Sequence, residues 1–451
     1  MNDTICGVST AVGIGAISII RISGKEAIKI TNKIFKGKDL NKVSSHTINY
    51  GHIIENGKIV DEVLVSIMKA PKTYTMENIV EINCHGSIAS VTKILELLIS
   101  QGCRLAEPGE FTKRAFLNGR IDLLEAESVM DVINSKTEAN LAVSINQLTG
   151  SATKMISNLR NEILNVLAQI EVKIDYPEYD DISDVTHSEL LENIENIENQ
   201  MNEILEESKT GKIIKEGIKT SIIGKPNVGK SSILNKLLEE EKAIVTPIAG
   251  TTRDIVEGTI NIDGILLNII DTAGIRKTND LIENIGVNKS INLINDSDMI
   301  LFVVDNSKAL DDEDLQILEK LKNKNYLILI NKIDLKSKID IKELDENKVI
   351  KISAKENIGI IELKKAIKNL YNISNIETRD LTYLTSARSI SLLKEAKEKI
   401  PDIKKSIQTS IPIDIIEIDI KSIWDILGKI IGETYEDELI DKLFSSFCLG
   451  K

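Results

Sequence analysis

The sequence predicts a multidomain protein that is α+β in its N-terminal part and α/β in its central part, with a helical domain split around the α/β part. Three observations predict this arrangement. Short β-branched runs fill residues 1–118, a helical texture covers 119–215 and 373–451, and strand-like and helical stretches alternate over 216–372. At about 150 residues per domain, a chain of 451 residues has room for three such parts.

The first 118 residues are expected to form a β-rich domain. Short runs of Ile, Val and Thr occupy 17–22, 47–54 and 63–68, and glycines separate them. Asn56 and Gly57 stand between two of these runs, and this pair is typical of a tight hairpin turn. A helix is expected after Gly86, with apolar residues on one face.

Residues 119–215 carry apolar side chains at helical spacing, and the stripes are expected to form the core of a helix bundle. The two stripes comprise Ile156, Leu159, Ile163, Val166 and Ile170, then Ile194, Ile197, Met201 and Ile204. Pro177 lies in the acidic stretch between them, where a helix should break. If this region packs against 373–451, the α/β part is an insertion within one helical domain.

Residues 216–372 are expected to form a mostly parallel sheet with crossover helices. The expected strands are 219–223, 266–270, 299–304 and 326–330.

Composition excludes several classes of protein. The 56 Lys and Arg against 69 Asp and Glu give a formal charge of −13, which argues against a broad basic face for nucleic acid but allows local contact with RNA. The 4 cysteines are scattered, so neither a disulfide framework nor a zinc ribbon is expected. No signal peptide or membrane span is evident, and the expected location is cytoplasmic.

Residues 224–231 fit the P-loop pattern G-x-x-x-x-G-K-[ST] between a strand-like run and a helical one. The glycines allow backbone amides to surround phosphate oxygens. Lys230 is expected to reach the β- and γ-phosphates, and the Ser231 hydroxyl is expected to bind Mg²⁺.

The base that is bound is predicted by Asn331-Lys332-Ile333-Asp334, which follows an expected strand. The Asp334 carboxylate can accept hydrogen bonds from guanine N1 and N2, whereas adenine offers neither donor. Such a site can discriminate by about 10⁴-fold. Ser353, Ala354 and Lys355 follow another apolar run and supply a backbone contact to the guanine oxygen. GTP is therefore expected rather than ATP.

Two switch segments are expected between these motifs. Asp271 begins Asp-Thr-Ala-Gly and should hold Mg²⁺, while Thr252 should complete the Mg²⁺ shell. Ile275 stands where Ras-type GTPases carry a glutamine that orients the attacking water. The residues alone leave three replacements open: Arg276, Asp280 and Glu283.

Several longer motifs resemble one family. Residues 81–86 (Glu-Ile-Asn-Cys-His-Gly), the block 107–123 and the final 447–451 (Phe-Cys-Leu-Gly-Lys) are similar to segments of the MnmE, or TrmE, family of tRNA uridine-modifying GTPases. The resemblance covers essentially the whole chain. It implies a folate-binding and dimerisation domain at 1–118, a helical domain at 119–215 and 373–451, and an inserted G domain at 216–372.

The resemblance also implies a reaction and partners. Family members form homodimers and act with a flavoprotein, MnmG, in a heterotetramer. Together they install a carboxymethylaminomethyl or aminomethyl group on the wobble uridine of certain tRNAs. The implied cofactors are GTP, Mg²⁺, K⁺ and a reduced folate, either 5,10-methylene- or 5-formyl-tetrahydrofolate, which supplies the one-carbon unit.

The resemblance implies residues for each site as well. Folate would be bound by Arg21, Glu81, Arg120 and Lys451, and K⁺ by Asn227, Thr246, Ile248 and Thr251. Glu283 is preferred over Asp280 as the group that positions water, and Cys448 is either a chemical or a packed residue. The full expected GTP site comprises Asn227, Val228, Gly229, Lys230, Ser231, Ser232, Thr246, Pro247, Ile248, Ala249, Gly250, Thr251, Thr252, Asp271, Thr272, Ala273, Gly274, Asn331, Lys332, Asp334, Ser353, Ala354 and Lys355.

Two other functions share the G-domain motifs. A ribosome-assembly GTPase of the Era or Der type would bind rRNA, but an Era-type chain carries a basic RNA-binding domain, and this C-terminal region is acidic. A GTP-gated scaffold without chemistry of its own is disfavoured by the folate-like residues.

Overall fold

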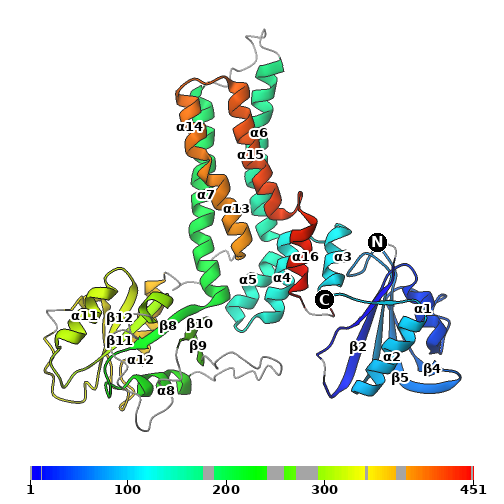
Figure 1. The fold of residues 1–451 in the computed structure, drawn as a ribbon, viewed down its shortest axis with the longest axis horizontal. Helices are drawn as coiled ribbons and strands as arrows, with labels where there is room; N and C mark the ends of the chain where they lie inside the picture. The colour runs from blue at the N-terminus through cyan, green and yellow to red at the C-terminus, as the bar shows by residue number, and fades with distance from the viewer. Residues whose placement is uncertain are drawn as a thin grey trace. The chain divides into compact units, whose positions relative to one another are not determined.

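The structure is a computed structural model in which the described residues are 3–11, 13–175, 187–240, 258–270, 293–340, 344–371, 382–447 and 450, and the side chains of 239 and 240 are excluded. The chain divides into two compact units. The first comprises 1–130, 153–190 and 398–451, and the second comprises 131–152 and 191–397 (Figure 1). Each unit is described here by itself.

The N-terminal part of the first unit is a seven-stranded sheet in the order β3-β4-β5-β6-β2-β1-β7. All neighbouring strands are antiparallel except β1 and β7. The expected hairpin forms between β4 and β5, where Asn56 and Gly57 have φ angles of 48° and 82°. The strands are β1 Ile5–Val8, β2 Gly15–Ser23, β3 Phe35–Lys36, β4 Thr47–Glu55, β5 Lys58–Met68, β6 Ile79–Gly86 and β7 Arg104–Leu105.

Two helices cover one face of this sheet, α1 Ala27–Ile34 and α2 Ile88–Ser100. The alternation of side chains along the strands buries Ile20, Val65 and Ile82 beneath these helices. The other face, called the open face below, exposes Ile17, Ile48, Tyr50 and Leu64.

The remaining helices of the first unit come from two separate stretches of the sequence, 110–175 and 400–445. Helix α3 packs against α16, where Phe444 and Phe447 approach Gly109. Arg160 of α6 donates to the carbonyl of Trp424 in α15 at 3.3 Å, which ties these two helices together. The helices are α3 Glu110–Leu117, α4 Leu123–Asn134, α6 Ser151–Asp175, α14 Ile400–Gln408, α15 Ile413–Ile431 and α16 Asp437–Ser445.

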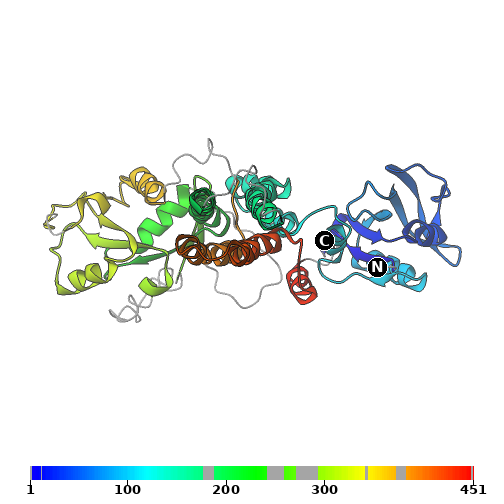
Figure 2. The same cartoon turned by 90° about the horizontal axis from the view of Figure 1, so that it is seen from above.

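The second unit contains a six-stranded sheet in the order β13-β12-β11-β8-β10-β9. All pairs are parallel except β9 with β10. Helices α8 and α12 pack on one face and α11 on the other, and Figure 2 shows α11 and α12 on opposite sides. The elements are β8 Ile218–Ile223, α8 Lys230–Glu240, β9 Gly258–Ile262, β10 Ile265–Ile269, β11 Met299–Asp305, α11 Asp312–Leu321, β12 Asn325–Asn331, the short 3₁₀ helix η2 Glu346–Lys348, β13 Val349–Lys351 and α12 Ile360–Leu370.

The second unit also contains α5 Glu138–Leu148, α13 Ala387–Glu398 and most of α7 His187–Glu216. The fold class predicted from the sequence is confirmed, because the N-terminal sheet, the helices and the mostly parallel central sheet are all present. Within the described part of the chain, none of the helices is both long enough and apolar enough to span a bilayer.

Candidate functional site

The P-loop begins where β8 ends and closes at the start of α8. Two of its glycines are required by close contacts. A Cβ on Gly224 would lie 2.2 Å from the carbonyl oxygen of Val303, and one on Gly229 would lie 2.1 Å from Asn331 Nδ2. Both glycines also have positive φ angles, 143° and 101°, which other residues rarely adopt. The motif therefore requires glycine at these two positions, because the backbone passes too close to Val303 and Asn331 for a larger residue.

Lys230 lies with its ammonium group inside the loop. Its Nζ donates to the carbonyls of Gly224 at 2.9 Å and Lys225 at 2.7 Å. Because the first residue of α8 is Lys230 itself, the ammonium group and the helix N-terminus both provide positive charge at this point. This combination favours a phosphate group.

Asn331 connects three segments at the end of β12. Its side chain is 2% exposed, its Nδ2 donates to the carbonyl of Val228 at 2.8 Å, and its Oδ1 accepts from the amide of Ala354 at 3.2 Å. The P-loop and the segment 353–355 are thereby held to the same strand end. A buried amide with both ends paired fixes geometry, since an unpaired end would cost free energy.

Lys332 extends from the same strand end with a φ angle of 66°. Its Nζ donates to the carbonyl of Asn227 at 2.7 Å and pairs with Asp305 at 2.6 Å. Burial alone would raise the pKa of Asp305, but hydrogen bonds from Lys332 and Ser307 outweigh burial and hold this pKa below the usual range. The carboxylate is therefore charged at neutral pH and keeps Lys332 against the loop.

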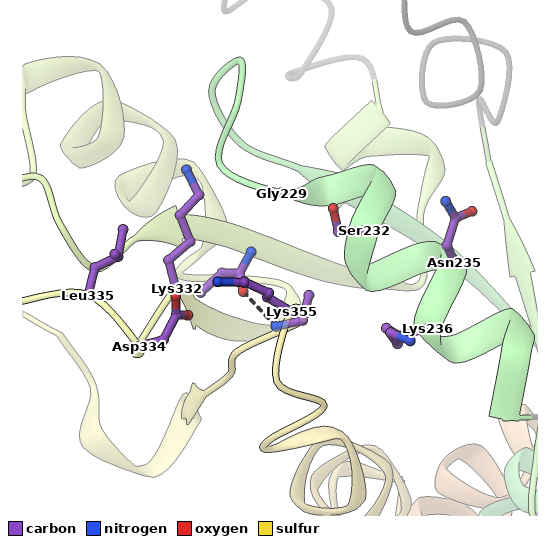
Figure 3. Close-up of a pocket in the computed structure, with 10 residues that line it drawn as sticks. Gly229, Ser232, Asn235, Lys236, Lys332, Asp334, Leu335 and Lys355 are labelled. Atoms are coloured by element: carbon purple, nitrogen blue, oxygen red, sulfur yellow. Dashed lines mark hydrogen bonds between the residues drawn. The ribbon is translucent and has the colours of Figure 1, made fainter.

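Asp334 accepts a hydrogen bond from Ser353 Oγ at 2.7 Å, and this bond lowers the pKa of the carboxyl group. A cavity of about 630 Å³ lies beside it. Figure 3 shows α8 along one side of the cavity and the segment after β12 on the other. The cavity is lined by Gly229, Ser232, Asn235, Lys236, Asn331, Lys332, Asp334, Leu335, Ala354 and Lys355.

A second cluster forms at the open face of the N-terminal sheet. Arg21 on β2 and Glu81 on β6 are direct cross-strand partners, and Arg21 Nε donates to Glu81 Oε1 at 2.9 Å. The Arg21 guanidinium lies 5.4 Å from the centre of the Tyr74 ring, and that of Arg120 lies 4.6 Å from it. Two cations that come from distant parts of the sequence thus meet at one aromatic ring.

The C-terminal end of the chain reaches the same cluster. Arg21 Nη1 donates to the carbonyl of Gly450 at 3.3 Å, and Ser9 Oγ donates to that carbonyl at 3.2 Å. Tyr74 is held in place by α3, because its hydroxyl is 2.8 Å from Thr112 Oγ1 on that helix. The cluster therefore combines groups from β2, β6, α3 and the last residues.

Comparison with known proteins identifies the family. A family model described as the GTP-binding protein TrmE N-terminus matches residues 4–120, and one described as the MnmE helical domain matches residues 123–448. The protein called tRNA modification GTPase MnmE from Bacillus mycoides is 52% identical over 455 residues, which covers 100% of this chain and 99% of that protein. The chain belongs to the MnmE family.

A second MnmE, from Bacillus cytotoxicus, shows the same 52% identity, with 100% of this chain and 99% of that protein covered. Among solved structures, the G domain of FeoB from Methanococcus jannaschii is 29% identical and covers 34% of this chain and 98% of that one, with a TM-score of 0.25. The family membership rests on the sequence relatives and the two family models.

The structure brings together the described members of both predicted sites. Gly229, Ser232, Asn331, Lys332, Asp334, Ala354 and Lys355 line the cavity, while Asn227, Val228 and Ser353 contact residues that do so. Lys230 and Ser231 open α8 at the end of the P-loop.

The other predicted site residues lie outside the described residues. They are Thr246, Pro247, Ile248, Ala249, Gly250, Thr251, Thr252, Asp271, Thr272, Ala273, Gly274, Glu283, Cys448 and Lys451.

Some contributors in this MnmE-family chain were missed by sequence reasoning. Asn235 and Lys236 line the cavity from the second turn of α8, where helical spacing from Ser232 could have indicated them. Asp305 ends β11 and pairs with Lys332, and its position at the carboxyl end of a parallel strand was the available signal. Tyr74 gave no comparable signal, because it lies in a loop between β5 and β6.

Proposed function

We propose that this chain binds and hydrolyses GTP and uses that reaction in modifying the wobble uridine of certain tRNAs. The observation that carries the proposal is the pair of hydrogen bonds by which Asn331 connects the P-loop to the segment 353–355, with Asp334 beside the cavity. Because these segments are held together, they support binding of a single ligand that carries both a phosphate chain and a guanine base. Membership of the MnmE family supports the tRNA reaction.

Different residues of the G domain would bind the base and the phosphates. Asp334 would accept from guanine N1 and N2, and the Ala354 region would supply a backbone contact to the guanine oxygen. Lys230 and the amides of the P-loop would neutralise the phosphates, and Ser231, with Thr252 and Asp271, would hold Mg²⁺. Mg²⁺ would supply charge neutralisation at the β- and γ-phosphates when it is bound.

K⁺ is proposed as a second cation, held by Asn227 with oxygens of Thr246, Ile248 and Thr251. It would neutralise charge between the β- and γ-phosphates, as an arginine finger does in other GTPases. This role suits a chain with Ile275 at the position of the usual glutamine. Glu283 is proposed to position the attacking water.

A reduced folate, 5,10-methylene- or 5-formyl-tetrahydrofolate, is proposed to bind at the open-face cluster and to supply the one-carbon unit. Glu81 is an acceptor of the kind that pterin N–H groups require, and Arg21, Arg120 and Lys451 suit the carboxylates of the glutamate tail. The side chains of Arg21 and Glu81 are 16% and 22% exposed, so both remain within reach of a ligand. Tyr74 would add a flat apolar surface.

The partners are proposed from the family and from the open face. A second copy of this chain would cover the apolar side chains Ile17, Ile48, Tyr50 and Leu64, which are between 45% and 68% exposed. The homodimer would act with the flavoprotein MnmG on tRNA, in the cytoplasm where tRNA is found. Cys448 is proposed to serve either the modification chemistry or the packing of the C-terminal end.

The tRNA function is tested by mass spectrometry of tRNA nucleosides from a strain that lacks this gene. We expect unmodified wobble uridine, restored by the wild-type gene but not by one encoding Lys230→Ala. Lys42→Ala is a matched control, because Lys42 is an exposed lysine whose side chain is 84% exposed. Fully modified wobble uridine in the deletion strain would refute the function.

The folate site is tested by calorimetry with 5-formyl-tetrahydrofolate. Wild-type protein should bind it, Arg21→Ala should weaken binding at least about tenfold, and Lys42→Ala should not change it. Wild-type protein that shows no heat of binding would rule out the folate assignment and leave the GTPase function untouched.

A further inference from the structure

Lys225, the second residue of the P-loop motif, connects the loop to a helix on the other face of the sheet. Its Nζ donates to Asp314 Oδ2 at 2.9 Å and also pairs with Asp311. Both carboxylates belong to the start of α11, which packs on the face opposite to α8. The side chains of Lys225 and Asp314 are 22% and 10% exposed, so this contact is largely shielded from water, whereas the side chain of Asp311 is 63% exposed.

The start of α11 fixes both carboxylates before Lys225 meets them. Asp311 is the N-cap residue and accepts from the amides of Glu313 at 3.0 Å and Asp314 at 3.3 Å. The Asp314 carboxylate accepts from the amide of Asp311 at 3.3 Å, which completes a capping box. The two acceptors are therefore held by the helix itself, and they lose little further freedom when Lys225 binds them.

The backbone of Lys225 contacts the residue that is expected to reach the phosphates. Its carbonyl accepts from Lys230 Nζ at 2.7 Å, beside the carbonyl of Gly224 at 2.9 Å. Lys225 thus contacts α11 through its side chain and the ammonium group of Lys230 through its backbone carbonyl.

The two halves of the P-loop are held by different parts of the domain. Asn331 and Lys332 hold the second half, through the carbonyls of Val228 and Asn227. Among the described contacts, the side chain of Lys225 is what ties the first half to the other face of the sheet.

We propose that Lys225 is a positioning residue: clamped by Asp311 and Asp314, it fixes the first half of the P-loop and thereby places Lys230 for the phosphates. The proposal rests on the proposed GTP binding and deepens it. Burial alone would lower the pKa of Lys225, but its two carboxylate partners raise it, so the clamp stays charged. Two anions neutralise this cation, which leaves it poorly suited to bind phosphate directly.

The test measures the dissociation constant of GDP for the full-length chain and three variants: Lys225→Ala, the acceptor variant Asp311→Asn/Asp314→Asn, and the combined variant that carries all three changes. We expect Lys225→Ala and the acceptor variant each to weaken GDP binding about fivefold, as loss of a partly buried ion pair does. The combined variant should be no more than about twofold weaker than either of them, because the same contact between Lys225 and the two carboxylates is lost in all three. Lys225→Arg should bind almost as well as wild type, since a guanidinium can also pair with both carboxylates.

The controls separate positioning from general stability. Lys368 pairs with Asp263 at 2.7 Å with its side chain 27% exposed, so Lys368→Ala removes a similar ion pair that does not involve the P-loop. This variant should keep the wild-type affinity for GDP. Asn at positions 311 and 314 retains the oxygens of the capping box, so the acceptor variant should melt within a few degrees of wild type. In steady-state hydrolysis the clamp variants should raise KM for GTP more than they lower kcat.

Several outcomes would overturn the proposal. If the acceptor variant Asp311→Asn/Asp314→Asn binds GDP as tightly as wild type while Lys225→Ala binds weakly, Lys225 contacts phosphate directly and is not a positioning residue. Multiplicative losses in the combined variant would show two independent interactions, and unchanged affinity in all variants would show no role in binding. A wild-type chain that binds no GDP would refute the GTPase function itself, and this inference with it.

Discussion

At the scale of single residues, the nucleotide site depends on a few side chains that each make more than one contact. Asn331 joins the P-loop to the segment 353–355, and Lys332 joins the P-loop to β11 through Asp305. Each contact is worth only about 1 kcal/mol net, but leaving a buried partner unpaired costs more. A substitution at Asn331 or Lys332 should therefore also disturb the position of the P-loop that the side chain contacts.

Asp334 should decide which base is bound. Because the hydrogen bond from Ser353 lowers the pKa of Asp334, the carboxylate is an acceptor at neutral pH. In Asp334→Asn one oxygen becomes an NH₂ donor, which opposes guanine N2 but suits the oxygen of xanthine. We expect GTP affinity to fall at least about 100-fold and xanthosine triphosphate to bind better than GTP, measured by fluorescence competition. Unchanged preference for GTP would contradict the proposed role.

Asn227 provides the test of the K⁺ proposal. Wild-type protein should hydrolyse GTP at least about tenfold faster in KCl than in NaCl. Asn227 has a φ angle of 63°, so Asn227→Gly removes the side chain without the backbone strain that alanine would add. This variant should lose the difference between the salts, measured by phosphate release. Equal rates in both salts for the wild type would exclude the role of K⁺.

At the scale of elements, an ion network locks α3 to the N-terminal sheet. Arg114 is 1% exposed and pairs with Glu110 at 2.9 Å, Asp3 at 2.8 Å and Glu77 at 3.2 Å. Arg104 pairs with Asp3 at 2.8 Å and contacts Glu110 as well. The network fixes the helix that carries Thr112, the partner of the Tyr74 hydroxyl in the open-face cluster.

Glu110→Gln should lower the free energy of unfolding by about 3 kcal/mol at pH 7, the effect of breaking a buried ion pair. Burial raises the pKa of Glu110, but hydrogen bonds from Arg104, the Glu107 amide and Arg114 lower it overall. Its contribution is therefore complete above the unfolded-state pKa, about 4.3, and is lost as pH falls through the lower folded-state pKa. Urea unfolding at several pH values should show that the variant loses less stability on acidification.

Glu26→Gln is the matched control for this experiment. Glu26 is the N-cap residue of α1 and pairs with Lys29 at 2.8 Å, with 55% of its own side chain exposed. Its removal should leave both the unfolding free energy and its pH dependence near those of wild type. A Glu110→Gln protein that matches this control would show that the network does not hold α3.

At the scale of the whole molecule, the end of the chain returns to its beginning. Phe444 of α16 is 1% exposed and packs beside Gly109 at the start of α3, and Gly450 accepts from Arg21 and Ser9. The open-face cluster is therefore completed only when α16 has docked.

Phe444→Ala should cost about 3–5 kcal/mol of stability, the usual penalty for emptying a buried phenyl site. It should also weaken binding of 5-formyl-tetrahydrofolate more than binding of GDP, because the cluster loses its C-terminal component. Thermal unfolding and calorimetry check the two effects. Leu439→Ala, on the same helix at a side chain that is 38% exposed, should change neither quantity. Equal loss of both ligands in Phe444→Ala would indicate general unfolding instead.

Local sequence determined much of this architecture. The P-loop motif, the expected strands and the segments that end in Asn331 and Ser353 could be predicted, because backbone geometry and strand alternation depend on residues close in sequence. The strands of the structure lie within one or two residues of the expected ones in the central sheet, and α8 begins at the expected end of the P-loop.

Tertiary structure alone decided which distant groups meet. Arg21, Tyr74, Arg120 and Gly450 gather because strand pairing and the docking of α16 bring them together, and no local spacing encodes those contacts. The same holds for Lys225, which the sequence placed only in the P-loop, whereas its ion pairs depend on where α11 begins. Short-range pattern fixes the elements, but the burial of apolar faces sets how they pack, and that packing makes the sites.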